Sequence, residues 1–245
     1  MKYVSKTDVG KKRKNNEDSI FSKIYNEDVA LYIVADGLGG YESGEVASSL
    51  LVEKISKYVE DNLDVITEYT DQKIKNVIHV ALILANNEIY RLEKTDKKYK
   101  GMGTTIVLLL KVKSKLYYIS IGDSRMYYIP EDKSSIEQVT VDDTYVNELI
   151  KTNVINEDEA SIHPQKHVLT KAVGIVRNID FEVKTVDKKN GFVILCSDGI
   201  TNMIEKEQLL ETMKKTDFED LADTYIEIAN KNGGVDNISV IIVEI

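Results

Sequence analysis

Short continuous apolar runs alternate along this chain with longer segments whose apolar residues recur at helical spacing. The run at residues 30–35 ends at Asp36-Gly37-Leu38-Gly39-Gly40, the pattern of a central strand that opens into a tight glycine loop. Helical spacing over residues 43–61 and 71–93 then predicts two helices. This part of the chain is therefore expected to supply a strand, a loop at its end and a pair of helices.

The pattern changes to β-branched and aromatic runs over residues 102–129, which predicts an antiparallel meander. Residues 141–165 are polar and lack alternation, so they are interpreted as an inserted flap with short helices. Because strands and helices do not alternate strictly, we expect an α+β protein of packed layers. The remaining predicted strands are 181–186, 191–196 and 239–244, and the remaining predicted helices are 205–213 and 218–230.

Composition narrows the class of protein. The 245 residues are 42% hydrophobic and 30% charged, which is ordinary for a globular chain, and we expect one domain over 1–245. The formal net charge of -9 argues against nucleic acid or an anionic membrane as partner. The single cysteine, Cys196, excludes an internal disulfide and fits a reducing compartment, so a cytoplasmic location is expected.

Nothing in the sequence predicts membrane insertion. Residues 1–19 are polar and include the basic run 11–14, so they lack the apolar core of a signal peptide. The longest apolar runs, such as 105–110 and 192–196, are far shorter than the roughly 20 residues that a spanning helix needs. These runs are interpreted as buried strands.

Four aspartates stand beside glycine or asparagine at the ends of apolar runs: Asp36, Asp123, Asp198 and Asp236. Asp-Gly is a common turn dipeptide, which accounts for any one of them taken alone. Carboxylates at several strand ends can instead converge, and such a cluster is tolerated when protons or cations neutralise it. Oxygen ligands without cysteine or histidine select magnesium or manganese over zinc.

Two further segments enter the candidate chemistry. Near the amino terminus, Arg13 and the pair Glu17-Asp18 add a guanidinium and two carboxylates. Taken alone, this segment is also consistent with a run of charged residues exposed to solvent. His163 and His167 are four residues apart, but Pro164 disfavours a regular helix across them, which weakens a zinc site. Cys196 lies within an apolar run and is interpreted as a small buried hydrophobe.

Taken in order, these segments resemble the signature motifs of the protein phosphatase 2C family, the metal-dependent Ser/Thr phosphatases, in their compact bacterial form. The resemblance spans nearly the whole chain and implies a sandwich of two antiparallel β-sheets flanked by pairs of helices, with a metal centre at one end. The motifs are Arg13 with Asn16-Glu17-Asp18, then VADGLGG, GMGTT, SIGDSRMY, residues 142–149, HPQKHVLTKAVG, LCSDGITNM and GGVDNISVIIV.

The resemblance implies a role for each candidate residue. Asp36 would bridge two Mn²⁺ or Mg²⁺ ions, and the Gly37 carbonyl would complete one of them. Asp198 and Asp236 would hold the other ion. Two such cations lower the pKa of a bridging water and clamp the attacking and leaving oxygens of an in-line displacement.

The resemblance also implies roles for residues around the two core ions. Asp18 and Glu17 would act on the metals through bound waters, and Glu17 and Asn237 would support the ligands. Asp123 would hold a third, weaker ion beside the flap; its alternative is a turn aspartate that caps a loop. Arg13 would grip the non-reacting phosphate oxygens in bidentate fashion, which lysine cannot do.

The sequence also departs from many relatives. Leu38 stands where the family often has a histidine, and leucine cannot transfer a proton to the leaving group. Residues 142–145 replace a frequent histidine-serine pair, so flap contacts with substrate are expected to differ.

The function implied is hydrolysis of phosphoserine and phosphothreonine on proteins by a metal-activated water. The phosphorylated partners would include a membrane-anchored Ser/Thr kinase and its substrates. Two alternatives stay open: an inactive regulator of the same fold that binds phosphoproteins, and a phosphodiesterase or nuclease with a similar carboxylate cluster.

Overall fold

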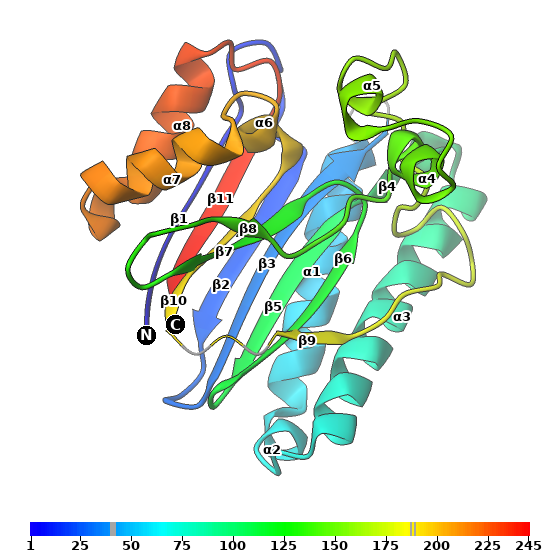
Figure 1. Cartoon of the computed structure of the whole chain (residues 1–245). Helices are drawn as coiled ribbons and strands as arrows, with labels where there is room; N and C mark the ends of the chain where they lie inside the picture. Colours follow the sequence, from blue (N-terminus) through cyan, green and yellow to red (C-terminus); the bar gives the residue numbers. More distant parts are fainter. Residues whose placement is uncertain (40–42, 187, 189) are drawn as a thin grey trace.

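Two antiparallel sheets packed face to face form the centre of the molecule, with helices on both outer faces (Figure 1). The computed structural model describes residues 1–39, 43–186, 188 and 190–245. The first sheet has the strand order β1-β11-β10-β7-β8, and the second has the order β2-β3-β5-β6-β9, with β4 paired to β3. The α+β sandwich expected from the sequence is confirmed.

The elements of the first sheet and its helices are β1 (Lys2–Asp8), β7 (Arg125–Pro130), β8 (Glu137–Gln138), β10 (Gly191–Cys196), α6 (Asp198–Thr201), α7 (Lys206–Lys215), η2 (Phe218–Asp220), α8 (Leu221–Lys231) and β11 (Ile238–Glu244). Those of the second are β2 (Asp18–Ile24), β3 (Val29–Leu38), α1 (Ser43–Asp61), α2 (Leu63–Ile66), α3 (Asp71–Thr95), η1 (Lys97–Tyr99), β4 (Gly103–Thr104), β5 (Ile106–Val112), β6 (Lys115–Ile121) and β9 (Lys184–Val186). The short helices α4 (Tyr145–Lys151) and α5 (Glu157–Ser161) lie above the end of the sandwich (Figure 1).

The central strands have unbroken apolar runs in their sequences because each strand is buried on both faces. In β3, Leu31 and Ile33 face α1 and α3, whereas Tyr32 and Val34 face the other sheet. Strand β10 divides in the same way, with Ile194 toward the helices α6–α8 and the neighbouring residues toward the sheet interface. The layers therefore follow the order helix, sheet, sheet, helix.

The structure differs from the sequence-based expectation in several strands. Strand β7 does not continue a meander: β6 pairs with β5 and β9, while β7 pairs with β10 and β8 in the other sheet. The chain crosses from one sheet to the other at Gly122, whose φ of +97° lies in a region that glycine adopts without strain. Strand β9 covers only Lys184–Val186. The sequence did not predict β1 or β2, which are edge strands whose residues are mostly exposed in β1 and mostly half-buried in β2.

In the described part of the chain, no helix combines the length and the apolar character needed to cross a bilayer.

Candidate active site

The chemistry-bearing residues meet because antiparallel strands bring their connections to one end of the sandwich. Strands β3 and β10 end there, at Leu38 and Cys196, and β2 and β11 begin there, at Asp18 and Ile238. The loop between β1 and β2 and the crossover from β6 to β7 lie at the same end. Segments far apart in sequence and from both sheets can therefore supply one site.

Asp18 and Asp36 form the base of the site from the second sheet. They are opposite each other in the β2–β3 register, which brings their side chains to one side of the ladder. The Ser197 hydroxyl donates to Asp18 Oδ2 at 2.8 Å, whereas Oδ1 is buried without a hydrogen-bond partner. Asp18 is 7% exposed, so one of its oxygens is left as an unused hydrogen-bond acceptor inside the protein.

The backbone around Asp36 is held by two threonines. The Asp36 N–H donates to Thr105 Oγ1 at 2.9 Å, and its carbonyl accepts from the Thr105 N–H at 2.8 Å and from Thr104 Oγ1 at 2.9 Å. Gly37 follows in a crowded position, where an added Cβ would lie 2.2 Å from the Gly44 carbonyl oxygen. Only glycine fits there, and the loop that begins after Asp36 is thereby fixed against α1.

Asp198 comes from the first sheet and opens helix α6 directly after β10. Its Oδ2 accepts a hydrogen bond from the Asn202 side chain at 2.9 Å, and its Oδ1 is buried without a partner. As in Asp18, one carboxylate oxygen is satisfied and the other is free to bind an additional group.

Asp236 and Asn237 lie in the loop before β11 and join the site to the N-terminal loop. Arg13 Nη2 donates to Asp236 Oδ2 at 2.9 Å, and the other carboxylate oxygen accepts from the Asn237 N–H at 2.8 Å. The Asn237 amide accepts from the Glu17 N–H at 2.8 Å and donates to two carbonyls of the N-terminal loop. Asn237 therefore fixes the loop that carries Arg13 and Glu17.

Asp123 occupies the crossover between β6 and β7. Its neighbour Ser124 shares a hydrogen bond of 2.7 Å with Thr105, which also holds Asp36. The Gly122 carbonyl accepts from the Asp143 N–H at 2.8 Å and so ties the crossover to the segment that carries α4 and α5. Asp123 is thus placed between the carboxylates of the strands and that segment.

A cavity of about 260 Å³ brings these groups together. Asp18 does not line this cavity. The residues that line the cavity and that the sequence analysis singled out are Arg13, Glu17, Asp36, Gly37, Leu38, Asp123, Asp198, Asp236 and Asn237. Gly39 also lines the cavity, whereas Gly40 of the predicted glycine loop lies outside the described residues.

The carboxyl groups strongly affect one another's pKa. Burial, reinforced by the charges of Asp18, Asp198, Asp123 and Asp236, raises the pKa of Asp36 well above its ordinary value. Burial raises the pKa of Asp18 to about 7, against hydrogen bonds from two serines that lower it. For Asp123, burial and then the charge of Asp198 raise the pKa to about 7. This group of carboxyls requires neutralisation by protons or by cations.

The donor set fits divalent cations. Its atoms are carboxylate and backbone oxygens, and the buried free oxygens of Asp18 and Asp198 offer unused lone pairs. Among the residues that the structure describes, no three acidic, histidine or cysteine side chains already stand as a metal cage. In this structure Asp236 accepts a hydrogen bond from Arg13, and Asp198 accepts one from Asn202.

Sequence reasoning missed several residues of the site. His167 and Leu169 line the cavity beside Asp36, although His167 was considered only as a zinc ligand. Ser197 and Thr105 hold the aspartates but carry no pattern that separates them from ordinary buried hydroxyls. Only the position of His167 inside the motif HPQKHVLTKAVG could have drawn attention to it.

Comparison with known proteins gives one consistent result. The family model described as "Protein phosphatase 2C" matches residues 10–240. Protein phosphatase PhpP of Streptococcus pneumoniae is 33% identical, with 97% of this chain and 94% of that protein covered. The structure of the Mycobacterium tuberculosis serine/threonine phosphatase PstP/Ppp aligns with a TM-score of 0.88 at 28% identity, over 100% of this chain and 98% of that one. A structure of the PstP catalytic domain in complex with two manganese ions aligns with a TM-score of 0.80 at 28% identity, over 98% and 96% of the two chains.

Proposed function

Because the chain belongs to the protein phosphatase 2C family, a family of metal-dependent phosphoprotein phosphatases, we propose that it hydrolyses phosphoserine and phosphothreonine with two Mn²⁺ or Mg²⁺ ions at the carboxylate cavity. The observation that carries the proposal is the convergence of aspartates from both sheets, with Arg13, on one cavity. Carboxylates and a guanidinium together suit a phosphate monoester held beside cations.

The proposed ligands come from both sheets. Asp36 and the Gly37 carbonyl would hold the ions from the second sheet, and Asp198 and Asp236 from the first. When bound, the cations supply a hydroxide nucleophile by lowering the pKa of water, and they neutralise charge on the phosphate. Asp18, which lies opposite Asp36 in the β2–β3 register, would act on the ions through bound water.

The protein's own groups orient the phosphate. Arg13 lines the cavity and can present two N–H groups to the non-reacting phosphate oxygens once Asp236 is neutralised by a cation. Glu17 and Asn237 hold the loop of Arg13 in place. Leu38 lines the cavity but has no proton to give to the leaving oxygen, so that proton comes from another group.

Other functions fit the site less well. Cys196 is buried and its thiol pKa is raised to about 12 by that burial, which excludes it as a nucleophile. A nuclease would need a basic surface, whereas this chain carries a net charge of -9. Among the described residues that line the cavity, Leu38 is the predicted site residue that departs from the family pattern by having no donor atom in its side chain. The other predicted site residues keep groups that can bind a metal or a phosphate, so nothing favours an inactive regulator.

A comparison of three substrates tests the proposal. The protein with Mn²⁺ should hydrolyse a small phosphomonoester and a phosphothreonine peptide, and should leave a phosphodiester nearly untouched. Faster cleavage of the diester would support the nuclease alternative. Binding of the phosphopeptide without turnover would support the inactive regulator.

Replacing Arg13 by alanine is expected to lower kcat/KM for a small phosphomonoester by roughly 10- to 150-fold, the equivalent of about 1.5 to 3 kcal/mol for charged hydrogen bonds. Arg13→Lys should restore only part of this, because lysine cannot contact two oxygens in a fork. Mn²⁺ affinity should not fall, since Arg13→Ala releases Asp236 from its ion pair. An unchanged kcat/KM would place Arg13 among the solvated surface charges.

Asp123→Ala tests the proposed third ion. We expect the variant to keep the two core metals, to need a higher metal concentration for activity and to lose turnover partially with a small substrate. The loss should be larger with a phosphopeptide, because Asp123 adjoins the segment that carries α4 and α5. Metal content and metal-dependent kinetics measure both effects. Identical metal dependence and kcat on both substrates would leave Asp123 with a structural role only.

The cellular setting proposed here is cytoplasmic, in opposition to a membrane-anchored Ser/Thr kinase. Its support is the single buried cysteine, which suits a reducing compartment, and the family resemblance. Loss of the phosphatase should raise phosphorylation of that kinase and of its substrates, which a phosphoproteome with and without the gene measures.

A further inference from the structure

A groove of about 580 Å³ extends the catalytic cavity along the segment 141–167. Asp123, His167 and Asp198 line both hollows, so the two are continuous. We propose that this groove binds the polypeptide on one side of the phosphorylated residue, and that Glu157 and Glu205 select substrates with lysine or arginine there. The inference rests on the proposed function, because it concerns the substrate of the same site.

The groove has an apolar wall suited to a peptide. Val141, Val146, Ile150 and Ala160 line it, and Val141 is 61% exposed although it is a large apolar residue. A peptide laid along this wall would remove that surface from water while its phosphorylated residue reaches Asp198 and Asp123. Continuity with the catalytic cavity therefore identifies the occupant as the substrate itself.

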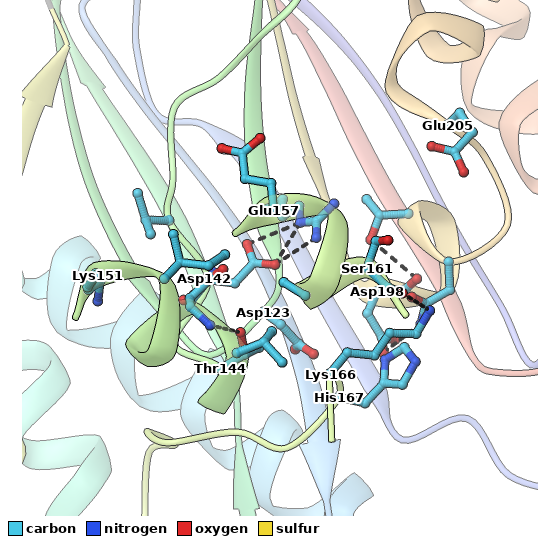
Figure 2. A pocket seen from close by; sticks show the side chains of 18 residues that line it. Asp123, Asp142, Thr144, Lys151, Glu157, Ser161, Lys166, His167, Asp198 and Glu205 are labelled. Atoms are coloured by element: carbon cyan, nitrogen blue, oxygen red, sulfur yellow. Dashed lines mark hydrogen bonds and ion pairs between the residues drawn. The ribbon is translucent and has the colours of Figure 1, made fainter. Parts of the chain in front are cut away.

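Two exposed carboxylates stand on the rims of the groove. Glu157 lies in the first turn of α5, and Glu205 immediately precedes α7. Within the described residues, neither carboxylate has a hydrogen-bond or ion-pair partner. In Figure 2, Glu157 and Glu205 lie in the upper part of the view, and Lys166 and His167 lie below them beside Asp198. The rim of the groove therefore carries two carboxylates that are unpaired within the described part of the chain, whereas Lys166 lies near the catalytic carboxylates.

The other charged groups of the groove are already neutralised or face the phosphate end. Arg125 pairs with both oxygens of Asp142: Nη2 donates to Oδ2 at 2.7 Å, and Nε donates to Oδ2 at 2.9 Å and to Oδ1 at 3.1 Å (Figure 2). Lys151 lines the groove and pairs at 2.7 Å with Glu148, which does not line it. Lys166 donates to a backbone carbonyl of its own segment at 3.0 Å and remains positive near Asp198, where phosphate charge would stand.

Charge complementarity thus predicts a phosphate end and a basic-residue end. A lysine or arginine a few residues from the phosphorylated residue would contact Glu157 and Glu205. Because both carboxylates are exposed, the desolvation free energy that opposes this contact is small. The overall charge of -9 would add attraction for basic substrates at low ionic strength. An acidic flanking sequence would meet the same two carboxylates unfavourably.

Matched phosphothreonine peptides test the inference. Lysine or glutamate is placed in turn at each position within about three residues on either side of the phosphothreonine, and kcat/KM is measured with Mn²⁺. The parent enzyme should prefer lysine on one side by roughly three- to tenfold, the range expected for exposed charge pairs. The preference should shrink as salt is raised.

Variants assign the preference to the two carboxylates. In the double variant Glu157→Gln/Glu205→Gln, the kcat/KM for the lysine peptide divided by that for the glutamate peptide should fall to near one. The control Asp158→Asn/Glu207→Gln removes the same charge from neighbouring exposed positions that do not line the groove, and it should keep the parent ratio. Hydrolysis of p-nitrophenyl phosphate should be unchanged in both.

Three results would overturn the inference: no preference in the parent, a preference for glutamate, or an equal loss in the control variant. Failure of the proposed function would look different, because p-nitrophenyl phosphate would then not be hydrolysed with Mn²⁺ by any of the proteins. The small substrate therefore separates an error about the groove from an error about the enzyme.

Discussion

Asp36→Asn is expected to lower kcat/KM for a small phosphomonoester by at least about 10²-fold, the scale at which loss of a preorganised charged group acts in active sites. Asp36 lies on a cavity that carboxyls from both sheets share, and its backbone is fixed by Thr104 and Thr105. An amide is a poor bridge between two cations because it carries no charge. The measurement is steady-state kinetics at modest Mn²⁺ concentration.

The same substitution should not harm the metal-free fold. It removes one negative charge from a buried group whose neighbours Asp18 and Asp198 repel it, so the free energy of unfolding without metal should stay equal or rise. Thermal unfolding in chelator checks this. Near-native turnover in Asp36→Asn, with the fold intact, would contradict the assignment of Asp36.

Complete removal of divalent cations should reduce hydrolysis to the uncatalysed background. The cavity is lined mainly by oxygen donors, with the Arg13 guanidinium and the His167 imidazole, and Cys196 is buried in strand β10. The proposed nucleophile is a metal-activated water, so none should form without the cations. Returning Mn²⁺ should restore activity, and returning Mg²⁺ should do so to an extent that reports the preferred ion. Kinetics on chelated protein, confirmed metal-free by elemental analysis, measures the effect.

An unchanged rate in confirmed metal-free protein would remove the cation-based mechanism altogether. A matched control is the chelated and remetallated protein, which should regain the starting rate and so show that chelation did not unfold it.

Sequence patterns predicted the buried elements well because burial on two faces leaves an unmistakable signal. The runs that became β3 and β10 are apolar at every position, since helices cover one face and the other sheet covers the second. Strand β1 gave no such signal, because it is an edge strand with mostly exposed residues. The transfer of β7 to the other sheet depends on Gly122 and on long-range pairing that no local pattern records.

Motif order predicted that Asp36, Asp198 and Asp236 belong to one site, and all three line one cavity, while their roles as ligands stay predictions. The contacts between the site residues could not be predicted, since the ion pair of Arg13 with Asp236 spans 223 residues of sequence. The groove that carries Glu157 and Glu205 was also invisible, because exposed glutamates have no distinguishing pattern. One domain over 1–245 with a flap at 141–165 stays a prediction.

The central claim is that aspartates from the two sheets form one cation centre, and Mn²⁺ binding tests it directly. Calorimetric titration of metal-free protein should show tight Mn²⁺ binding in the parent and in the exposed control Asp64→Asn. Binding should be strongly weakened both in Asp36→Asn, on the second sheet, and in Asp236→Asn, beside the first. If both variants bound Mn²⁺ with the stoichiometry and affinity of the parent, the account of this site would be wrong.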